Sequence, residues 1–164
     1  MATHHHRTLD RRAEAAQFAL ERPDSAHAAA LIGELEAHLA ARYPAESRHG
    51  YSVDKLLREG VAFFVARVEG AAAGCGGVQL FGTEYGELKR MYVRPPFRGL
   101  GLGKRLVDCL AAYAHERGVR LLRLETGIHQ SEAIGLYEAC GFRRRAPFAP
   151  YREDPLSLFY EKRI

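Results

Sequence analysis

Three glycines at alternate positions, Gly99, Gly101 and Gly103, are the residues whose chemical use is clearest, and Lys104 follows them directly. Glycine allows backbone N–H groups to approach an anion because no Cβ stands in the way. An apolar periodic pattern begins at Leu102, so the glycines lead into the first turn of a helix, where the partial positive charge also favours anions. The sequence therefore predicts a phosphate or pyrophosphate site at this loop.

Two common phosphate motifs do not fit this loop. The Walker pattern needs a hydroxyl residue after its lysine and a four-residue glycine gap, whereas Arg105 follows Lys104 and the glycines alternate. The dinucleotide fingerprint needs G-x-G-x-x-G in a βαβ unit, and here the pattern is G-x-G-x-G with no upstream parallel βαβ signal. Both nucleotide-binding classes are therefore disfavoured.

The spacing that does match is R-x-x-G-x-G, formed by Arg98, Gly101 and Gly103 after a strand that ends in Met91-Tyr92-Val93. It resembles the acyl-CoA pyrophosphate loop of the GNAT superfamily of N-acetyltransferases. The stretch from Gln130 to Phe142 resembles the next motif of that superfamily, N-x-x-A followed by a Leu-Tyr pair and Gly-Phe, although Gln130 replaces the usual Asn. Two motifs in the right order are more specific than one, and the resemblance covers residues 61–142 and the final strand.

The resemblance implies the GNAT fold, an α/β (α+β) fold with a mixed, mostly antiparallel sheet flanked by about four helices. Its strands at 87–93 and 119–126 would splay apart and admit acetyl-CoA, which leaves as CoA. Pantetheine would lie along the first of these strands and the pyrophosphate on the loop amides. The implied cofactor-binding residues are Met91, Tyr92, Val93, Arg98, Gly99, Leu100, Gly101, Leu102, Gly103, Lys104, Gln130 and Tyr137.

Acetylation of an amine needs a base for the amine and an acid for the departing thiolate. Tyr137 stands where the superfamily commonly has a tyrosine near the CoA sulfur, and an ordinary phenol, with a pKa of about 10, is protonated at neutral pH. Tyr137 is therefore the expected acid. A backbone amide near Met91 or Tyr92 would polarise the thioester carbonyl.

Glu87 is the leading candidate for the base, because some members of the superfamily keep a catalytic glutamate at this offset before the end of the strand. Its alternative role is an ion pair with Lys89 or a neighbouring arginine. Three further residues are alternative bases: Glu125, His129 and His49.

Two segments, 43–51 and 143–155, are expected to form the acceptor site, because the superfamily builds it from the corresponding regions. Both mix aromatic residues, arginines and carboxylates, which suits a small amine that carries a carboxylate. Arg48 or Arg152 would clamp the carboxylate, and Glu46 or Asp154 would face the ammonium group. Alternatively, Arg143–Arg145 is a solvated edge or contacts the CoA 3′-phosphate. The expected substrate-binding residues are Glu46, Arg48, His49, Tyr151 and Arg152.

The elements that must position these residues can be read from periodicity and caps. A short strand at 17–21 precedes a helix that Asp24 or Ser25 caps, and Ser52 caps a second helix that closes at Gly60. Three β-rich runs follow, at 61–68, 75–81 and 87–93, and then a helix that ends at Gly118. The rest of the chain is predicted as a strand at 119–126, a helix at 131–139, and strands at Phe142 and 156–162. The order predicts one mixed α/β domain over 15–164.

Composition describes a chain of one domain: 164 residues with a net charge of +4. Six basic residues and no acidic ones fall between Lys89 and Arg105, so this window alone carries +6 and the remaining 18 basic and 20 acidic residues carry −2. The positive charge is thus concentrated at the loop predicted to hold a polyphosphate. No interleaved aromatic and basic motif indicates a nucleic-acid partner.

No signal peptide or membrane span is evident, so a cytoplasmic location without a membrane partner is expected. Residues 1–14, which include His4-His5-His6, are expected to be a disordered leader. The three cysteines have no C-x-x-C spacing, which argues against disulfides and a zinc site, and no metal is expected. A homodimer is a further expectation, because dimers are common among proteins that this one resembles.

The leading function is therefore transfer of the acetyl group of acetyl-CoA to a primary amine of a small, amino-acid-like molecule, by direct attack in a ternary complex. The alternatives are acetylation of a protein lysine or N-terminus, which calls for an open groove, and a non-catalytic acyl-CoA sensor, which needs neither Glu87 nor Tyr137.

Overall fold

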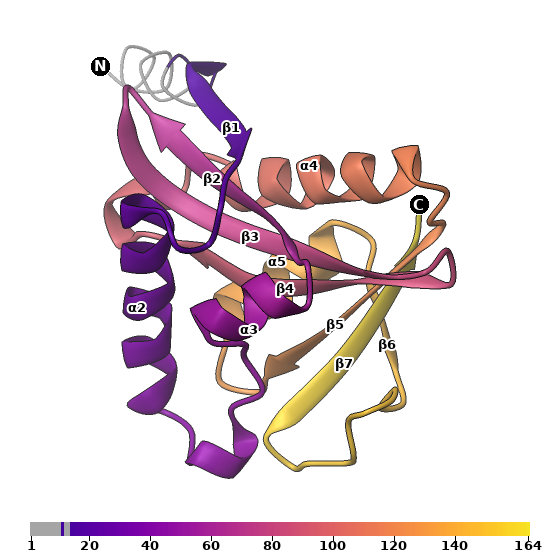
Figure 1. Cartoon of the computed structure of the whole chain (residues 1–164). Coiled ribbons are helices and arrows are strands. Elements are labelled where there is room, and N and C mark those ends of the chain that lie inside the picture. Colours follow the sequence, from indigo (N-terminus) through magenta and orange to yellow (C-terminus); the bar gives the residue numbers. More distant parts are fainter. Residues whose placement is uncertain (1–10, 12–13) are drawn as a thin grey trace, which may run out of the picture.

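The computed structural model describes Arg11 and residues 14–164, and its strands join in a single sheet (Figure 1). The strand order is β1-β2-β3-β4-β5-β7-β6, and within it only β4 and β5 pair in parallel. The strands are β1 (Ala16–Leu20), β2 (Ala62–Val68), β3 (Ala71–Phe81), β4 (Tyr85–Val93), β5 (Leu121–Gly127), β6 (Arg143–Arg145) and β7 (Ser157–Arg163). This is the mixed, mostly antiparallel sheet that the sequence predicts.

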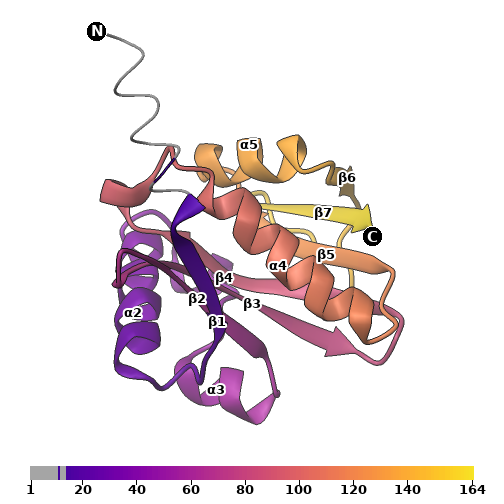
Figure 2. The same cartoon turned by 90° about the horizontal axis from the view of Figure 1, so that it is seen from above.

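Helices cover both faces of the sheet, as the view from above shows (Figure 2). Those described are α2 (Ala26–Ala40), α3 (Val53–Arg58), α4 (Leu102–Glu116) and α5 (Ser131–Ala139), with short 3-10 turns η1 (Ala45–Ser47) and η2 (Pro95–Phe97). On one face, Leu31 of α2 and Leu56 of α3 pack on Phe63 and Val65 of β2. On the other, the apolar side of α4 packs with Tyr137 of α5 on strands from β2 to β7. In the part of the chain described, no helix is long and apolar enough to span a membrane.

The sheet opens between β4 and β5. These strands pair only at Gly86 with Leu122 and at Glu87 with Arg123, and they diverge beyond that point (Figure 1). Gly86 allows β4 and β5 to approach each other closely where they pair, because a Cβ there would lie 3.0 Å from Val78 and 3.2 Å from Leu122. Glu87 therefore stands where the predicted splay begins, and the rest of β4 has no partner on its β5 side.

A β-bulge changes the direction in which the side chains of β4 point beyond Glu87. Cys75 pairs with Tyr92 and Gly77 pairs with Lys89, so β4 carries one extra residue at this point. Arg90 within it has φ of 56°, a left-handed conformation that is uncommon outside glycine. As a result, Lys89 and the adjacent Arg90 both reach Tyr51. Lys89 lies over the Tyr51 ring, and Arg90 donates a hydrogen bond to the Tyr51 carbonyl oxygen.

The predicted caps are present. The Ser25 hydroxyl accepts a hydrogen bond from Ala28 N, and the Ser52 hydroxyl accepts one from Lys55 N, both at 3.2 Å. Gly118 and Gly141 adopt positive φ just after α4 and α5, which allows these helices to end abruptly.

The predicted strands are present with shifted bounds: β3 begins at Ala71 and not at 75, and β4 begins at Tyr85 and not at 87. Two further shifts have a clear physical reason. Val119 still donates its N–H to Ala114 O at the end of α4, so β5 begins at Leu121. Phe142 likewise bonds to Tyr137 O and is buried against α5, so β6 begins one residue later. The predicted leader at 1–14, with its histidines, falls almost wholly outside the described residues.

Candidate active site

A groove of about 690 Å³ runs along the free end of β4, past the glycine loop, to the start of α5. Eleven of the predicted cofactor residues line it: Met91, Tyr92, Val93, Arg98, Gly99, Gly101, Leu102, Gly103, Lys104, Gln130 and Tyr137. Leu100 does not, because its side chain is buried with Leu102 and Ala73 in a small core cluster. The groove is large enough for an extended ligand, and two cationic side chains, Arg98 and Lys104, line it.

The three loop glycines have different uses. Gly99 and Gly101 adopt φ of 80° and 76°, and a Cβ at either position would meet no atom within 4 Å. Gly101 is the N-cap of α4, so the loop presents backbone amides and a helix N-terminus to the groove. At Gly103, in contrast, a Cβ would lie 2.8 Å from Leu136 Cδ2, so this glycine serves the contact between α4 and α5. The open loop fits a pyrophosphate.

Gly101→Ala tests the conformational requirement separately from sterics. We expect it to lower the free energy of unfolding by about 1–2 kcal/mol, because an L-residue in the left-handed region meets its own carbonyl. Urea unfolding measures this, with Gly33→Ala as control, since Gly33 lies within α2 and a Cβ there meets nothing. A Gly101→Ala protein as stable as the wild type would contradict the loop geometry.

A second cavity of about 110 Å³ lies beside the groove, at the splay. It is bordered by β4, by the end of β5, and by the segments after α2 and before β7. The two cavities share five lining residues: Leu35, Met91, Gln130, Ala133 and Tyr137. Tyr137, which is only 5% exposed, therefore stands at the junction of this cavity and the 690 Å³ groove, which is called the cofactor groove below because the predicted cofactor residues line it. Burial raises the pKa of its phenol, and the charge of Glu125 adds to the effect, so the phenol keeps its proton.

Glu87 lines the second cavity but is engaged in a buried triad. Lys89 Nζ lies 2.7 Å from Glu87 Oε2 and donates a hydrogen bond to the Tyr151 hydroxyl at 2.8 Å, and Tyr151 in turn donates to Glu87 Oε2. The side chains of Lys89 and Glu87 are 5% and 2% exposed. Burial lowers the pKa of Lys89 although Glu87 opposes this, and burial with the Glu87 charge raises the pKa of Tyr151. The alternative role predicted for Glu87, an ion pair with Lys89, is therefore present.

Glu125 faces the same cavity from β5, across the splay. Glu125 as a whole is half-buried, and burial of its carboxyl raises the pKa of Glu125 to about 7. The Glu87 charge also raises this pKa, whereas the Lys89 charge lowers it. His129, in contrast, lines the groove and not the second cavity, and its backbone N–H donates a hydrogen bond to the Tyr43 hydroxyl. Of the alternative bases, only Glu125 and His49 border the second cavity.

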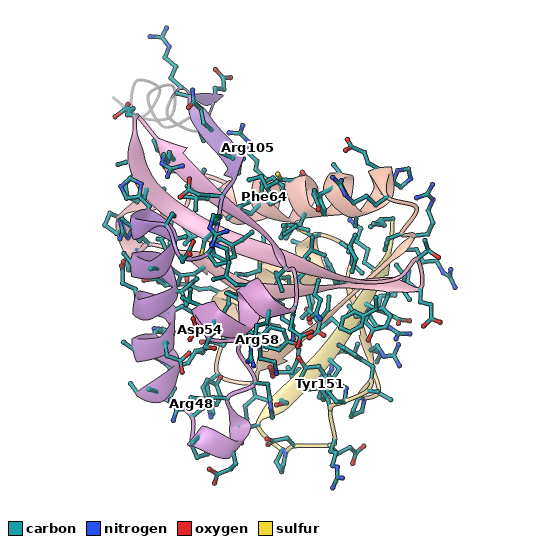
Figure 3. The ribbon with its side chains drawn as sticks, viewed as in Figure 1. Arg48, Asp54, Arg58, Phe64, Arg105 and Tyr151 are labelled. Atoms are coloured by element: carbon teal, nitrogen blue, oxygen red, sulfur yellow. The ribbon has the colours of Figure 1, made fainter. Side chains whose placement is uncertain are left out.

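The predicted substrate residues divide into two groups. Arg48, His49 and Tyr151 line the second cavity. Figure 3 shows Arg48 beside η1 and Tyr151 beside β7. Glu46 and Arg152 are exposed and line neither cavity.

Asp154 ties the two segments together. It accepts a hydrogen bond from the Ser47 hydroxyl at 2.8 Å and lies 3.8 Å from His49 Nε2. Hydrogen bonds from Leu156 N and Ser47 lower the pKa of Asp154. As a carboxylate, Asp154 connects the two segments that form one wall of the second cavity. It does not line either cavity.

Several residues that the sequence reasoning missed complete the site. Arg90 reaches it through the bulge and donates to Glu36 at 2.6 Å, while Gly50 makes room for its guanidinium. Tyr43 packs where Gly127 lacks a side chain, since a Cβ at Gly127 would lie 2.2 Å from the Tyr43 hydroxyl. No periodic pattern in the sequence reveals a bulge, and the contact between Tyr43 and Gly127 joins positions that are distant in the sequence.

The splayed sheet, the amide-lined loop beside it, and a buried tyrosine at the junction of two cavities are the features of an acyl-CoA-dependent acyltransferase. The model of the Acetyltransferase (GNAT) family matches residues 19–142, and the chain therefore belongs to this family.

Known proteins agree with this assignment. The chain is 46% identical to the "IAA acetyltransferase" of Azospirillum brasilense over 134 residues, which cover 80% of this chain and 87% of that protein. It is 37% identical to a Klebsiella pneumoniae protein assigned to the acyl-CoA N-acyltransferases, whose structure superposes with a TM-score of 0.76 over 90% of this chain and 97% of that one. PaiA N-acetyltransferase from Thermoplasma acidophilum, solved with coenzyme A, shares the fold with a TM-score of 0.71, 19% identity, and coverage of 91% and 99%.

Proposed function

We propose that the protein transfers the acetyl group of acetyl-CoA to a primary amine of a small, amino-acid-like molecule. The observation that carries this proposal is the second cavity: it is small, meets the cofactor groove at Tyr137, and is walled by two segments that the Ser47–Asp154 hydrogen bond joins. A protein lysine or N-terminus would need an open channel across this wall. The proposal of a small acceptor therefore rests on the small size of the cavity, about 110 Å³.

The chemistry follows from the residues at the junction. Acetyl-CoA supplies the acetyl group as a thioester. A carboxylate of the second cavity removes a proton from the acceptor ammonium, the nitrogen then forms a bond to the acetyl carbon, and the C–S bond breaks. Tyr137 gives its phenol proton to the departing sulfur, and the second proton released by the nitrogen replaces it. A backbone amide near Met91 or Tyr92, beside the bulge at Arg90, would polarise the acetyl carbonyl.

Direct transfer is favoured over an acetylated enzyme. None of the three cysteines, all within the described residues, lines either cavity, and Cys75 is buried, which raises the pKa of its thiol to about 12. A thiol with so high a pKa is a poor nucleophile at neutral pH.

Arg48 is the proposed anchor for the carboxylate of the acceptor. Its Nε is buried without a hydrogen-bond partner, and its Nη1 lies 3.6 Å from Glu36, so the guanidinium keeps donors for a ligand in the cavity. A planar guanidinium binds a carboxylate through two parallel hydrogen bonds.

A panel of amines tests this assignment. Thiol release from acetyl-CoA is followed with amino acids and with the matching amines that lack the carboxylate, and we expect only the former to be good substrates. Arg48→Gln should raise KM for the amino acid about 10–100-fold, since a charged hydrogen-bonded pair contributes about 1.5–3 kcal/mol, and should leave KM for acetyl-CoA unchanged. Arg152→Gln, at an exposed position of the same wall, is the control. Equal rates with both amine classes would contradict the anchor.

The other functions have distinct outcomes. Turnover on peptides but on no small amine would favour a protein acetyltransferase, and tight CoA binding without turnover would favour a sensor. A cytoplasmic location and a homodimer stay predictions.

A further inference from the structure

Two carboxylates, Glu87 and Glu125, face the second cavity from opposite sides of the splay, and the reaction proposed above gives its proton to one carboxylate. The sequence favours Glu87. The contacts of the two side chains favour a different division of roles.

Glu87 is poorly placed to receive a proton. One of its oxygens already binds the Lys89 ammonium at 2.7 Å and accepts the Tyr151 hydrogen bond. Protonation would neutralise the partner of a buried ammonium, and a buried charge without its partner is strongly unfavourable. Glu87 therefore holds Lys89 and Tyr151 in position.

Glu125, unlike Glu87, is free to receive a proton without breaking an ion pair. It faces the cavity without an ion pair within 4 Å among the described residues, so a neutral carboxyl there leaves no cation uncompensated. Its charge also acts on Tyr137, where it adds to the larger effect of burial in raising the pKa of the phenol. An acceptor amine that enters between Glu125 and Tyr137 would meet the base and the acid of the reaction together.

We infer that Glu125 is the catalytic residue that accepts the proton of the acceptor ammonium, and that Glu87 is a positioning residue acting through Lys89 and Tyr151. The inference rests on the proposed function. In the step, the ammonium N–H bond breaks, the proton passes to a Glu125 carboxylate oxygen and then to solvent, and the nitrogen lone pair becomes free to form the C–N bond.

The charged surroundings set the pH range of this step. The pKa of Glu125 is affected by the Ser157 side chain of β7 and by the charges of Lys89, Glu87 and Asp154. The charge of Glu125 acts in turn on the phenols of Tyr137 of α5, Tyr43 after α2 and Tyr151 before β7. Burial raises the pKa of Glu125 to about 7, so the base form is present above neutral pH and is lost as the pH falls below it. Removal of the Glu87 charge would lower the pKa of Glu125, because that charge raises it.

The experiment measures kcat/KM for the best amine against pH in the wild type, Glu125→Gln, Glu87→Gln and Glu116→Gln. The ionisation of the amine itself affects all four proteins equally. We expect Glu125→Gln to lower the rate about 10²–10⁴-fold and to abolish the acidic limb near pH 7. Glu87→Gln should keep this limb but move it to lower pH. Glu116→Gln, on the exposed end of α4, should match the wild type.

Glu125→Gln with an intact acidic limb, or Glu87→Gln without one, would overturn the inference. A direct carboxyl titration by ¹³C NMR, with the Glu125 signal assigned by its absence in Glu125→Gln, does not depend on activity. A midpoint near 7 supports the inference, and a midpoint at the ordinary value of about 4.3 overturns it. If wild-type protein acetylates no amine, the proposed function fails, and the NMR titration still judges the state of Glu125.

Discussion

Tyr137→Phe is expected to lower kcat by about 10²–10⁴-fold while KM for acetyl-CoA changes little, since general acid catalysis contributes a factor of this size. The phenol lies at the junction of the two cavities, and its raised pKa keeps it protonated as the donor for the departing thiolate. Phenylalanine preserves the edge contact with Phe142, whose ring centroid lies 5.7 Å away, so folding is expected to be unchanged. Steady-state thiol release measures the effect.

Tyr160→Phe is the matched control for that experiment. Tyr160 is as buried as Tyr137, and its hydroxyl donates to Glu138 at 3.0 Å, but it lines neither cavity. Its removal should leave kcat within a few-fold of the wild type. Equal losses in the two variants, or full activity in Tyr137→Phe, would contradict the role of Tyr137 as the acid.

Lys89→Met is expected to cause the largest loss of stability among the changes considered. It leaves Glu87, whose side chain is 2% exposed, as a buried carboxylate without its cation, and removing one partner of such a pair costs about 3–5 kcal/mol. Urea unfolding measures this. Glu87→Gln/Lys89→Met should be more stable than Lys89→Met alone, because the second change removes the unpaired charge.

Lys55→Met controls for the loss of a lysine that contacts the same ring. Lys55 Nζ lies 4.2 Å from the centroid of Tyr51 and Lys89 Nζ lies 4.0 Å from it, but Lys55 has no buried ion pair and should cost about 1 kcal/mol at most. A Lys89→Met protein as stable as Lys55→Met would show that the triad is not a buried ion pair in solution.

The sequence predicted the fold because its signals are local. Ser25, Ser52, Gly118 and Gly141 begin or end helices through contacts with residues a turn away, and the periodicity of α4 identifies its buried face. The glycine loop could be predicted for the same reason, since positive φ at Gly99 and Gly101 is a property of those residues.

The acceptor side could be predicted only in part, because it depends on contacts distant in the sequence. Tyr151 reaches Glu87 across 64 positions, and Arg90 turns toward the site only because β4 gains a residue against β3. The exposed Glu46 and Arg152 have the same residue types as lining residues, so composition alone could not separate them. The state of Glu125 likewise depends on burial that arises in the folded chain.

An initial-rate matrix in which acetyl-CoA and the best amine are both varied tests the central claim most directly. Direct transfer at the junction of the two cavities predicts amine-dependent thiol release, a product one acetyl group heavier than the amine, and reciprocal plots that intersect. Parallel lines would indicate an acetylated enzyme, and thiol release that does not depend on any amine would contradict the proposed transfer altogether.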